Sequence, residues 1–188
     1  MRMYEFSRKT LETEVYVKVN IDGSGESLID SSITFLNHML KTFSLFSSFD
    51  LIVRAKGDLR HHIIEDVAIC LGKAIDNALG DREDIERFGY SIIPMDCSLA
   101  LVSLDLARRP YAVVNLNCVH ERIDDISVQE IKHFLRSFAY SANITLHVNV
   151  LYGEDDHHKV EAVFKALGLA FKNAIYPSKG CKSVKGIV

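Results

Sequence analysis

The sequence predicts an α+β protein in which one unit, a small sheet with two helices on one of its faces, occurs twice. Segments that alternate apolar and polar residues are interspersed with segments of helical spacing. The stretch GDLRHHIIEDVAICLG at 57–72 returns as GEDDHHKVEAVFKALG at 153–168, and no linker rich in Gly, Pro or Ser separates the two copies. We therefore expect two halves, 1–90 and 91–188, packed as one compact subunit.

The repeat indicates an internal duplication. When the chain is shifted by 96 positions, residues 57–79 match 153–175 at 10 of 23 positions, and HMLKTF at 38 falls over HFLRSF at 133 with one residue of slippage. Two amphipathic helices could share Leu and Ala by composition alone, but composition does not explain coincident rare residues. The ten identities are Gly57, His61, His62, Glu65, Val67, Leu71, Gly72, Ala74, Asn77 and Ala78, each with its counterpart 96 positions later.

In the first half, two segments alternate apolar and polar residues, and two others have apolar residues at helical spacing. TEVYVKVNI at 13–21 and FDLIVRAK at 49–56 predict half-buried strands. Residues 35–47 and 61–79 predict helices, the second of which ends toward Gly80 as a stop signal.

The second half follows the same plan. SLALVSLDLA at 98–107, YAVVNLN at 111–117 and ITLHVNVLY at 144–152 predict strands, and residues 128–141 and 156–174 predict helices. Each half therefore provides the sheet and the two helices of the predicted unit.

Charge and composition exclude several classes of protein. A formal net charge of −3 offers no general attraction to nucleic acid or to an anionic membrane. No apolar run approaches the roughly 18 residues that span a bilayer, and the amino end lacks the apolar core of a signal peptide, so we expect a cytoplasmic protein. The four cysteines are widely scattered without a CxxC pair, which favours reduced thiols.

The duplicated histidines have the spacing of metal ligands. Residues four apart share a helix face, so His61 can bind one ion together with Glu65, and the same holds for the repeated pair at 157 and 161. The adjacent His62 and His158 point about 100° away and should serve a different ion or a neighbouring chain. The upstream histidines at 38 and 133 would each add a third imidazole.

Six histidines and two glutamates thus supply three nitrogens and one oxygen for each of two metals. Such sites suit Mn²⁺, Fe²⁺ or Zn²⁺, among which the sequence does not choose, and the lack of a cysteine argues against a closed structural zinc site. A single histidine at a helix start is usually a cap or a solvated side chain, but two matched sets favour ligation. His120 and His147 we interpret as solvated.

The chain resembles imidazoleglycerol-phosphate dehydratases of histidine biosynthesis through nearly all of its length. The resemblance is carried by RKTLET at 8–13, FLNHML at 35–40, FDLIVRAKGDL at 49–59, HHIIEDVAICLGKAI at 61–75, RFGYSIIPMD at 87–96, RRPY at 108–111, KHFLRSFA at 132–139 and LYGEDDHHKVEAVFKALG at 151–168. It implies a duplicated, ribosomal protein S5 domain 2-like fold. It also implies a homo-oligomeric cage of twenty-four chains with two Mn²⁺ in each active site, between subunits.

Position by position, the resemblance implies roles for fourteen residues. Metal ligation would fall to His38, His61, His62, Glu65, His133, His157, His158 and Glu161. Glu12 matches an acidic residue beside the reacting part of the substrate, and the phosphate would be held by Arg87, Arg109, Lys165, Ser183 and Lys185. A competing alignment of the tail assigns the last two roles to Ser178 and Lys179.

The implied reaction is the dehydration of D-erythro-imidazole-glycerol phosphate to imidazole-acetol phosphate, with Glu12 as the catalytic group that moves the proton. In this family the substrate imidazole bridges the two metals as imidazolate, because no carbonyl is adjacent to the carbon that loses its proton. The alternative is a non-catalytic, metal-dependent assembly protein on the same scaffold, which would need neither Glu12 nor the phosphate-binding cations. A di-metal hydrolase is a weaker third reading, because no bridging carboxylate is evident.

Besides the closing KSVKG at 182–186, four features depart from the family pattern. Asn37 stands where the family has an aspartate before the first histidine, Thr42 replaces a substrate-binding glutamine, and Cys97 replaces a glutamate. Arg60 directly precedes His61, so that the loop before it is shorter by about three residues.

Overall fold

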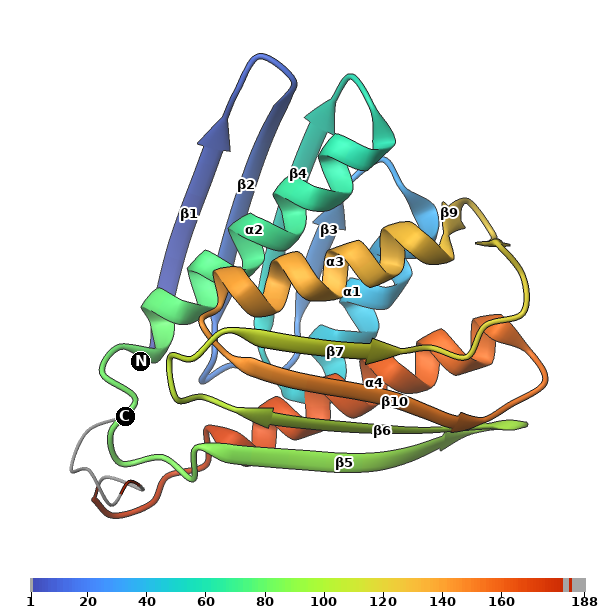
Figure 1. The fold of residues 1–188 in the computed structure, drawn as a ribbon. Helices are drawn as coiled ribbons and strands as arrows, with labels where there is room; N and C mark the ends of the chain where they lie inside the picture. Colours follow the sequence, from blue (N-terminus) through green and yellow to red (C-terminus); the bar gives the residue numbers. More distant parts are fainter. Residues whose placement is uncertain (1, 181–182, 184–188) are drawn as a thin grey trace.

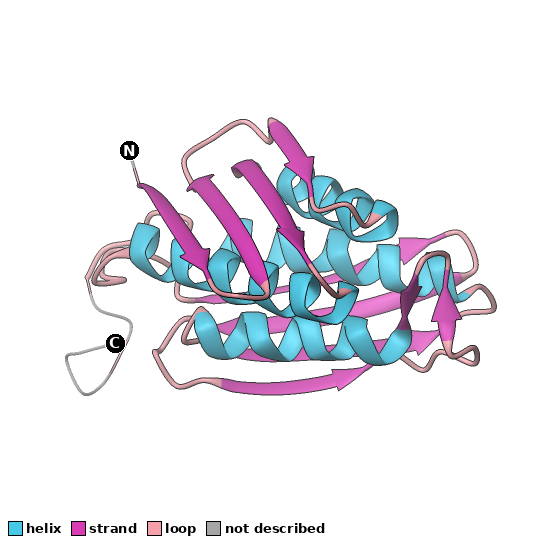
Figure 2. Ribbon diagram, turned by 90° about the horizontal axis from the view of Figure 1, so that it is seen from above, coloured by secondary structure: helices cyan, strands magenta, loops and turns pink. Residues whose placement is uncertain are grey.

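Two four-stranded sheets enclose a layer of four helices, as Figures 1 and 2 show in two views. The computed structural model describes residues 2–180 and residue 183. Each sheet is covered on one face by the helices of its own half, and the helices of the two halves meet in the middle of the molecule.

The first half forms a sheet of strand order β1-β2-β4-β3, in which β3 is parallel to β4 and the other pairs are antiparallel. Its elements are β1 (Met3–Lys9), β2 (Thr13–Asn20), β3 (Ser27–Asp30), α1 (Thr34–Ser47), β4 (Asp50–Gly57) and α2 (Arg60–Leu79). The β3-α1-β4 crossover places α1 on the same face of the sheet as α2.

The second half repeats this topology as β5-β6-β10-β7, again with one parallel pair, β7 and β10. Its elements are β5 (Phe88–Met95), β6 (Ser98–Asp105), β7 (Tyr111–Asn115), β8 (Arg122–Ile123), β9 (Ile126–Ser127), α3 (Val128–Ser141), β10 (Thr145–Tyr152) and α4 (Asp156–Ala174). The hairpin of β8 and β9 is an addition that the first half does not contain. Equal strand order in both sheets agrees with the duplication inferred from the sequence.

The predicted helices and strands are present, with ends that differ by at most two residues. Five strands were not predicted, namely the edge strands β1, β3 and β5 and the short pair β8 and β9. Nearly every residue of β1 is exposed, so no apolar alternation marks it, and β5 contains Gly89 and Pro94, which are depleted in strands. The boundary predicted between residues 90 and 91 falls inside β5, so the second sheet begins slightly earlier, at Phe88.

Helix packing joins the two halves crosswise, because α1 packs against α4 and α2 against α3. Phe43 of α1 lies edge-on to Phe171 of α4, with ring centroids 5.7 Å apart, and to Phe138 of α3 at 6.4 Å. Buried side chains of both halves therefore form one hydrophobic core. Although α2 runs for 20 residues, no described helix is long and apolar enough to cross a membrane.

Candidate functional site

Crosswise packing brings a histidine of the first half to a carboxylate of the second. His38 of α1 and His157 of α4 both direct Nε2 at the Oε2 atom of Glu161, at 3.6 and 3.5 Å. The two imidazole rings lie 6.0 Å apart. We call these three residues the α1–α4 cluster, whose donor atoms all lie within 4.8 Å of one another.

A matching group, the α2–α3 cluster, consists of His61, Glu65 and His133. His61 Nε2 lies 3.8 Å from Glu65 Oε2, and His133 Nε2 lies 3.5 Å from Glu65 Oε1. The two rings stack, with centroids 5.0 Å apart. In both clusters the upstream histidine thus joins the His-x-x-x-Glu pair of the opposite half, a pairing that the sequence alone left open.

The ligand-bearing helices begin close to these clusters, and α3 and α4 are each capped by the side chain of their own N-cap residue. Asp155 caps α4 by accepting hydrogen bonds from the backbone N–H groups of His157 and His158, at 2.7 and 3.4 Å. Ser127 and Glu130 form a reciprocal capping box at the start of α3. These caps position the first turn of each helix, where the histidines of α4 lie.

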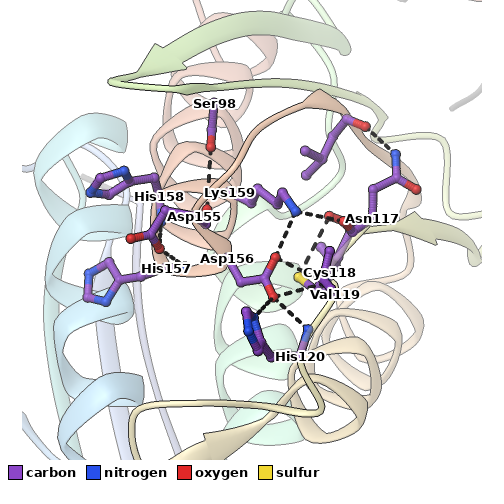
Figure 3. A network of polar contacts seen from close by, with 12 residues as sticks. Ser98, Asn117, Cys118, Val119, His120, Asp155, Asp156, His157, His158 and Lys159 are labelled. Atoms are coloured by element: carbon purple, nitrogen blue, oxygen red, sulfur yellow. Dashed lines mark hydrogen bonds and ion pairs between the residues drawn. The ribbon is translucent and has the colours of Figure 1, made fainter.

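Asp156 and Lys159 form a buried ion pair next to the histidines of α4 (Figure 3). Lys159 Nζ donates to Asp156 Oδ1 at 2.7 Å and to the carbonyl of Asn117 at 2.8 Å, and the other oxygen of Asp156 contacts the backbone and ring nitrogens of His120. Burial opposes ionisation of Asp156, but these hydrogen bonds outweigh it and lower its pKa to about 2. The pair attaches the loop that follows β7 to the start of α4, on the side away from His157 and His158.

His62 lies outside both clusters, as its helical angle predicts. Its Nδ1 is 2.8 Å from Asp58 Oδ1 and 3.8 Å from Glu12 Oε2. The hydrogen bond with Asp58, chiefly, raises the pKa of His62 against the opposing effect of desolvation, and the charge of Glu12 adds to it.

His158 is also outside the clusters and lies beside Cys97 and Asp96. The Cys97 Sγ is 3.6 Å from His158 Nδ1, and Asp96 Oδ2 is 3.6 Å from Nε2. Hydrogen bonds from Ser98, from the backbone N–H of Asp155 and from His158 lower the pKa of the Cys97 thiol to about 6.

Glu12 lies at the turn between β1 and β2, next to the start of α2. Its backbone N–H donates to the Thr10 hydroxyl at 3.1 Å, and its carbonyl accepts from the N–H of Asp58 at 3.0 Å. A Cβ at Gly57 would lie 2.9 Å from the Glu12 carbonyl, so glycine permits this close approach. The side chain of Glu12 is exposed on the His62 side of the turn.

Of the described cations predicted to hold phosphate, Arg87 and Arg109 lie together at Asp105, whereas Lys165 lies elsewhere. Arg87 and Arg109 both contact Asp105, at 2.7 and 3.5 Å. The backbone N–H of Arg87 bonds the carbonyl of Ala174, which places Arg87 at the far end of α4 from its histidines. Lys165 lies in the middle of α4, with Nζ 2.9 Å from Glu161 Oε1.

The carboxyl-terminal candidates are only partly described. Ser183 is described and half-buried, whereas Lys185 lies outside the described residues. Of the alternative pair, Ser178 donates its backbone N–H to the carbonyl of Asp84 at 2.8 Å. The choice between Ser183 with Lys185 and Ser178 with Lys179 therefore stays a prediction.

Each cluster borders a hollow on the surface. A hollow of about 740 Å³ is lined by Cys97, His120, Arg122, His157 and His158, among others. A second, of about 390 Å³, lies against His61 and His133. Arg122, in β8, lines both hollows.

Comparison with known proteins assigns the chain to a family. The sequence model of imidazoleglycerol-phosphate dehydratases matches residues 31–171. The enzyme of that name from Clostridioides difficile is 46% identical over 190 residues, which cover 96% of this chain and 99% of the relative. The one from Methanosarcina mazei is also 46% identical and covers 99% of both chains. The chain belongs to the imidazoleglycerol-phosphate dehydratase family. It is an enzyme of the hydro-lyase class.

Solved structures of this family have the same fold. The imidazoleglycerol-phosphate dehydratase of Pyrococcus furiosus superimposes with a TM-score of 0.86 at 37% identity, covering 97% of this chain and 99% of that one. The Staphylococcus aureus enzyme gives the same TM-score at 31% identity, covering 94% and 99%. The predicted duplicated α+β fold is therefore confirmed.

The departures from the family pattern have clear places in the structure. The Asn37 side chain accepts from the backbone N–H and hydroxyl of Ser31, at 2.9 and 2.6 Å, and so ties the β3–α1 loop. Thr42 is buried in α1. Arg60, the first residue of α2 after the shortened loop, pairs with the carboxylate of Asp125 at 3.3 Å.

Two carboxylates near the histidines were missed by the sequence analysis. Asp58 accepts from His62 and precedes it by four residues, a spacing that could have identified it. Asp124 Oδ2 lies 2.8 Å from His157 Nδ1, but the two residues are far apart in the chain and no motif connects them. Only the fold brings this second pair together.

Proposed function

We propose that this enzyme dehydrates D-erythro-imidazole-glycerol phosphate to imidazole-acetol phosphate in histidine biosynthesis, with two Mn²⁺ in each active site. The observation that carries the proposal is the pair of clusters, each of which assembles two imidazole nitrogens and one carboxylate from both halves of the chain. Family membership supports the substrate, and the donor sets support the metals.

The donor atoms fit a transition metal. Two ligands of one ion at about 2.1 Å, separated by roughly 90–110°, stand about 3.0–3.5 Å apart. The nitrogen-to-oxygen distances in the α1–α4 cluster are 3.5 and 3.6 Å, and those in the α2–α3 cluster are 3.5 and 3.8 Å. Small side-chain movements would therefore complete each set. Imidazole with carboxylate suits Mn²⁺, Fe²⁺ and Zn²⁺ alike, and Mn²⁺ is our choice from the family resemblance.

His62 and His158 provide the argument for shared sites. Each cluster supplies three donors, whereas eight ligands for two metals require four per ion. Because these two histidines project outside the clusters of their own chain, we propose that each completes a cluster of a neighbouring chain. The twenty-four-chain cage follows from the family resemblance and would provide such neighbours.

The two clusters would hold the metals, which when bound would supply Lewis-acid chemistry to the reaction we propose. The residues of the chain then have separate tasks. Glu12, beside His62, moves the proton of the reacting carbon, and its anchored backbone keeps the carboxylate at the edge of the site. Arg87, Arg109 and Lys165 are the described cations we assign to the phosphate, because a phosphate dianion needs several cationic hydrogen-bond donors.

A direct assay tests this function. Imidazole-glycerol phosphate is mixed either with protein from which a chelator has removed the metal or with Mn²⁺-loaded protein. The enolised product is followed by ultraviolet absorbance. We expect turnover only with the metal. A non-catalytic assembly protein would bind Mn²⁺ without forming product, and metal-independent product formation would contradict the assigned role of the clusters.

A further inference from the structure

The turn between β8 and β9 contacts the starts of three ligand-bearing helices. Asp125 accepts from the backbone N–H groups of Thr34 and Phe35, at 2.9 and 3.0 Å, and so caps α1. It also pairs with Arg60 at the start of α2. The neighbouring Asp124 reaches the first turn of α4, and β9 leads directly into α3.

Asp124 contacts one particular nitrogen of His157. Its Oδ2 lies 2.8 Å from Nδ1, while Nε2 of the same ring faces Glu161 at 3.5 Å. A hydrogen bond donated by Nδ1–H to a carboxylate leaves the lone pair on Nε2, the atom directed into the α1–α4 cluster. Metal-binding histidines are commonly oriented by such an outer carboxylate, which also raises their basicity as ligands.

The backbone conformation of Asp124 makes glycine a suitable replacement for it. The residue adopts φ of 48°, in the left-handed region that favours glycine. A glycine would occupy this turn at lower conformational cost.

The two clusters differ in whether a carboxylate contacts Nδ1 of a ligand histidine. Among the described residues, no carboxylate contacts Nδ1 of His61 or of His133, and the Nε2 of His133 lies near the hydroxyl of Ser137 at 3.5 Å. Asp124 can therefore affect one of the two clusters and leave the other unchanged.

We propose that Asp124 is a positioning residue that holds His157 with Nε2 directed at the metal of the α1–α4 cluster. The inference rests on the proposed metal function and extends it to a residue outside the ligand set. It makes the two metals of one chain unequal in their dependence on the β8–β9 turn.

The test is a Mn²⁺ titration in which electron paramagnetic resonance counts the free ion. Parent protein should bind two ions per chain. Asp124→Gly should weaken one of them by about 10–100-fold and leave the other at parental affinity. In Asp124→Asn the amide oxygen still accepts the Nδ1 hydrogen bond. The Mn²⁺ affinity of the weakened site in this variant should therefore lie between those of the parent and of Asp124→Gly. The melting temperature of metal-free Asp124→Gly should equal or exceed that of the parent, because glycine relieves the left-handed backbone.

Asp84→Gly is the matched control, since Asp84 is another aspartate with positive φ, 54°, and lies between α2 and β5 away from both clusters. It should leave both affinities unchanged. Equal binding by parent and Asp124→Gly, or an equal loss at both sites, would overturn the inference. If the parent binds no Mn²⁺ at all, the proposed metal function fails first and the positioning role with it.

Discussion

Glu12 lies in a turn and His62 in the first turn of α2, yet Glu12 Oε2 is only 3.8 Å from His62 Nδ1 at the edge of the site. Because a glutamine keeps the shape of this side chain but cannot take up a proton, Glu12→Gln should reduce kcat by about 10²–10⁴-fold. Metal content and particle size should not change, since Glu12 belongs to neither cluster. Steady-state kinetics and metal analysis of the same preparation check this expectation.

Glu14→Gln is a suitable control for that variant. Glu14 is an exposed neighbour on β2 that pairs with Lys9 and Lys56 at 3.4 and 3.1 Å. It should retain parental turnover. Near-normal turnover in Glu12→Gln would show that another group moves the proton.

The projecting histidines lead to a second expectation at this scale. His62→Ala and His158→Ala should each lower metal content and activity together, because each removes one of four proposed ligands from an ion. His147→Ala should change neither, since His147 lies on the exposed face of β10 near Tyr111. Full metal content in both alanine variants would exclude these two histidines from the ligand set.

At the scale of elements, the duplicated glycines allow the helices to cross closely. A Cβ at Gly72 of α2 would lie 2.8 Å from the Phe138 carbonyl of α3, and one at Gly168 of α4 would lie 2.9 Å from the Phe43 carbonyl of α1. These crossings place the histidine of one half beside the glutamate of the other. The sequence revealed the repeated glycines, but not the contact that they permit.

Substitution of either glycine tests this packing. Gly72→Ala or Gly168→Ala should lower the free energy of unfolding by about 1–2 kcal/mol, because overpacking outweighs the better helix propensity of alanine. Asn77→Ala, at an exposed position of α2, should stay within about 0.5 kcal/mol of the parent. Urea unfolding of metal-free protein measures both, and a stabilised glycine variant would contradict the close crossing.

At the scale of the whole molecule, shared metal sites would couple metal binding to assembly. If ligands of one ion come from two chains, the free energy of metal binding also stabilises the association. Chelation should therefore yield a smaller species in light scattering, and added Mn²⁺ should restore the large particle. An unchanged particle in verified metal-free protein would contradict shared sites, though not metal binding.

The tail offers a separate test of phosphate binding. Deletion of residues 182–188 removes Ser183 and Lys185 but keeps Ser178 and Lys179. We expect KM to rise strongly and kcat to fall, with metal content unchanged, because phosphate binding energy holds the reacting carbon in place. Kinetics of Lys185→Ala and Lys179→Ala identify the residue responsible. A large effect at Lys179 with none at Lys185 would move the phosphate site upstream.

The sequence by itself determined the duplication, the helices and central strands, and the candidate ligands, because all of these depend on local periodicity or on repeated rare residues. The edge strand β1 was not recognisable, since an exposed strand needs no apolar alternation. Only the tertiary structure decided that His38 meets Glu161 and that His133 meets Glu65. The same holds for Asp124 and His157, which are brought together by helix packing and a β-turn. Such contacts join residues far apart in the chain, and local spacing carries no information about which helices pack together.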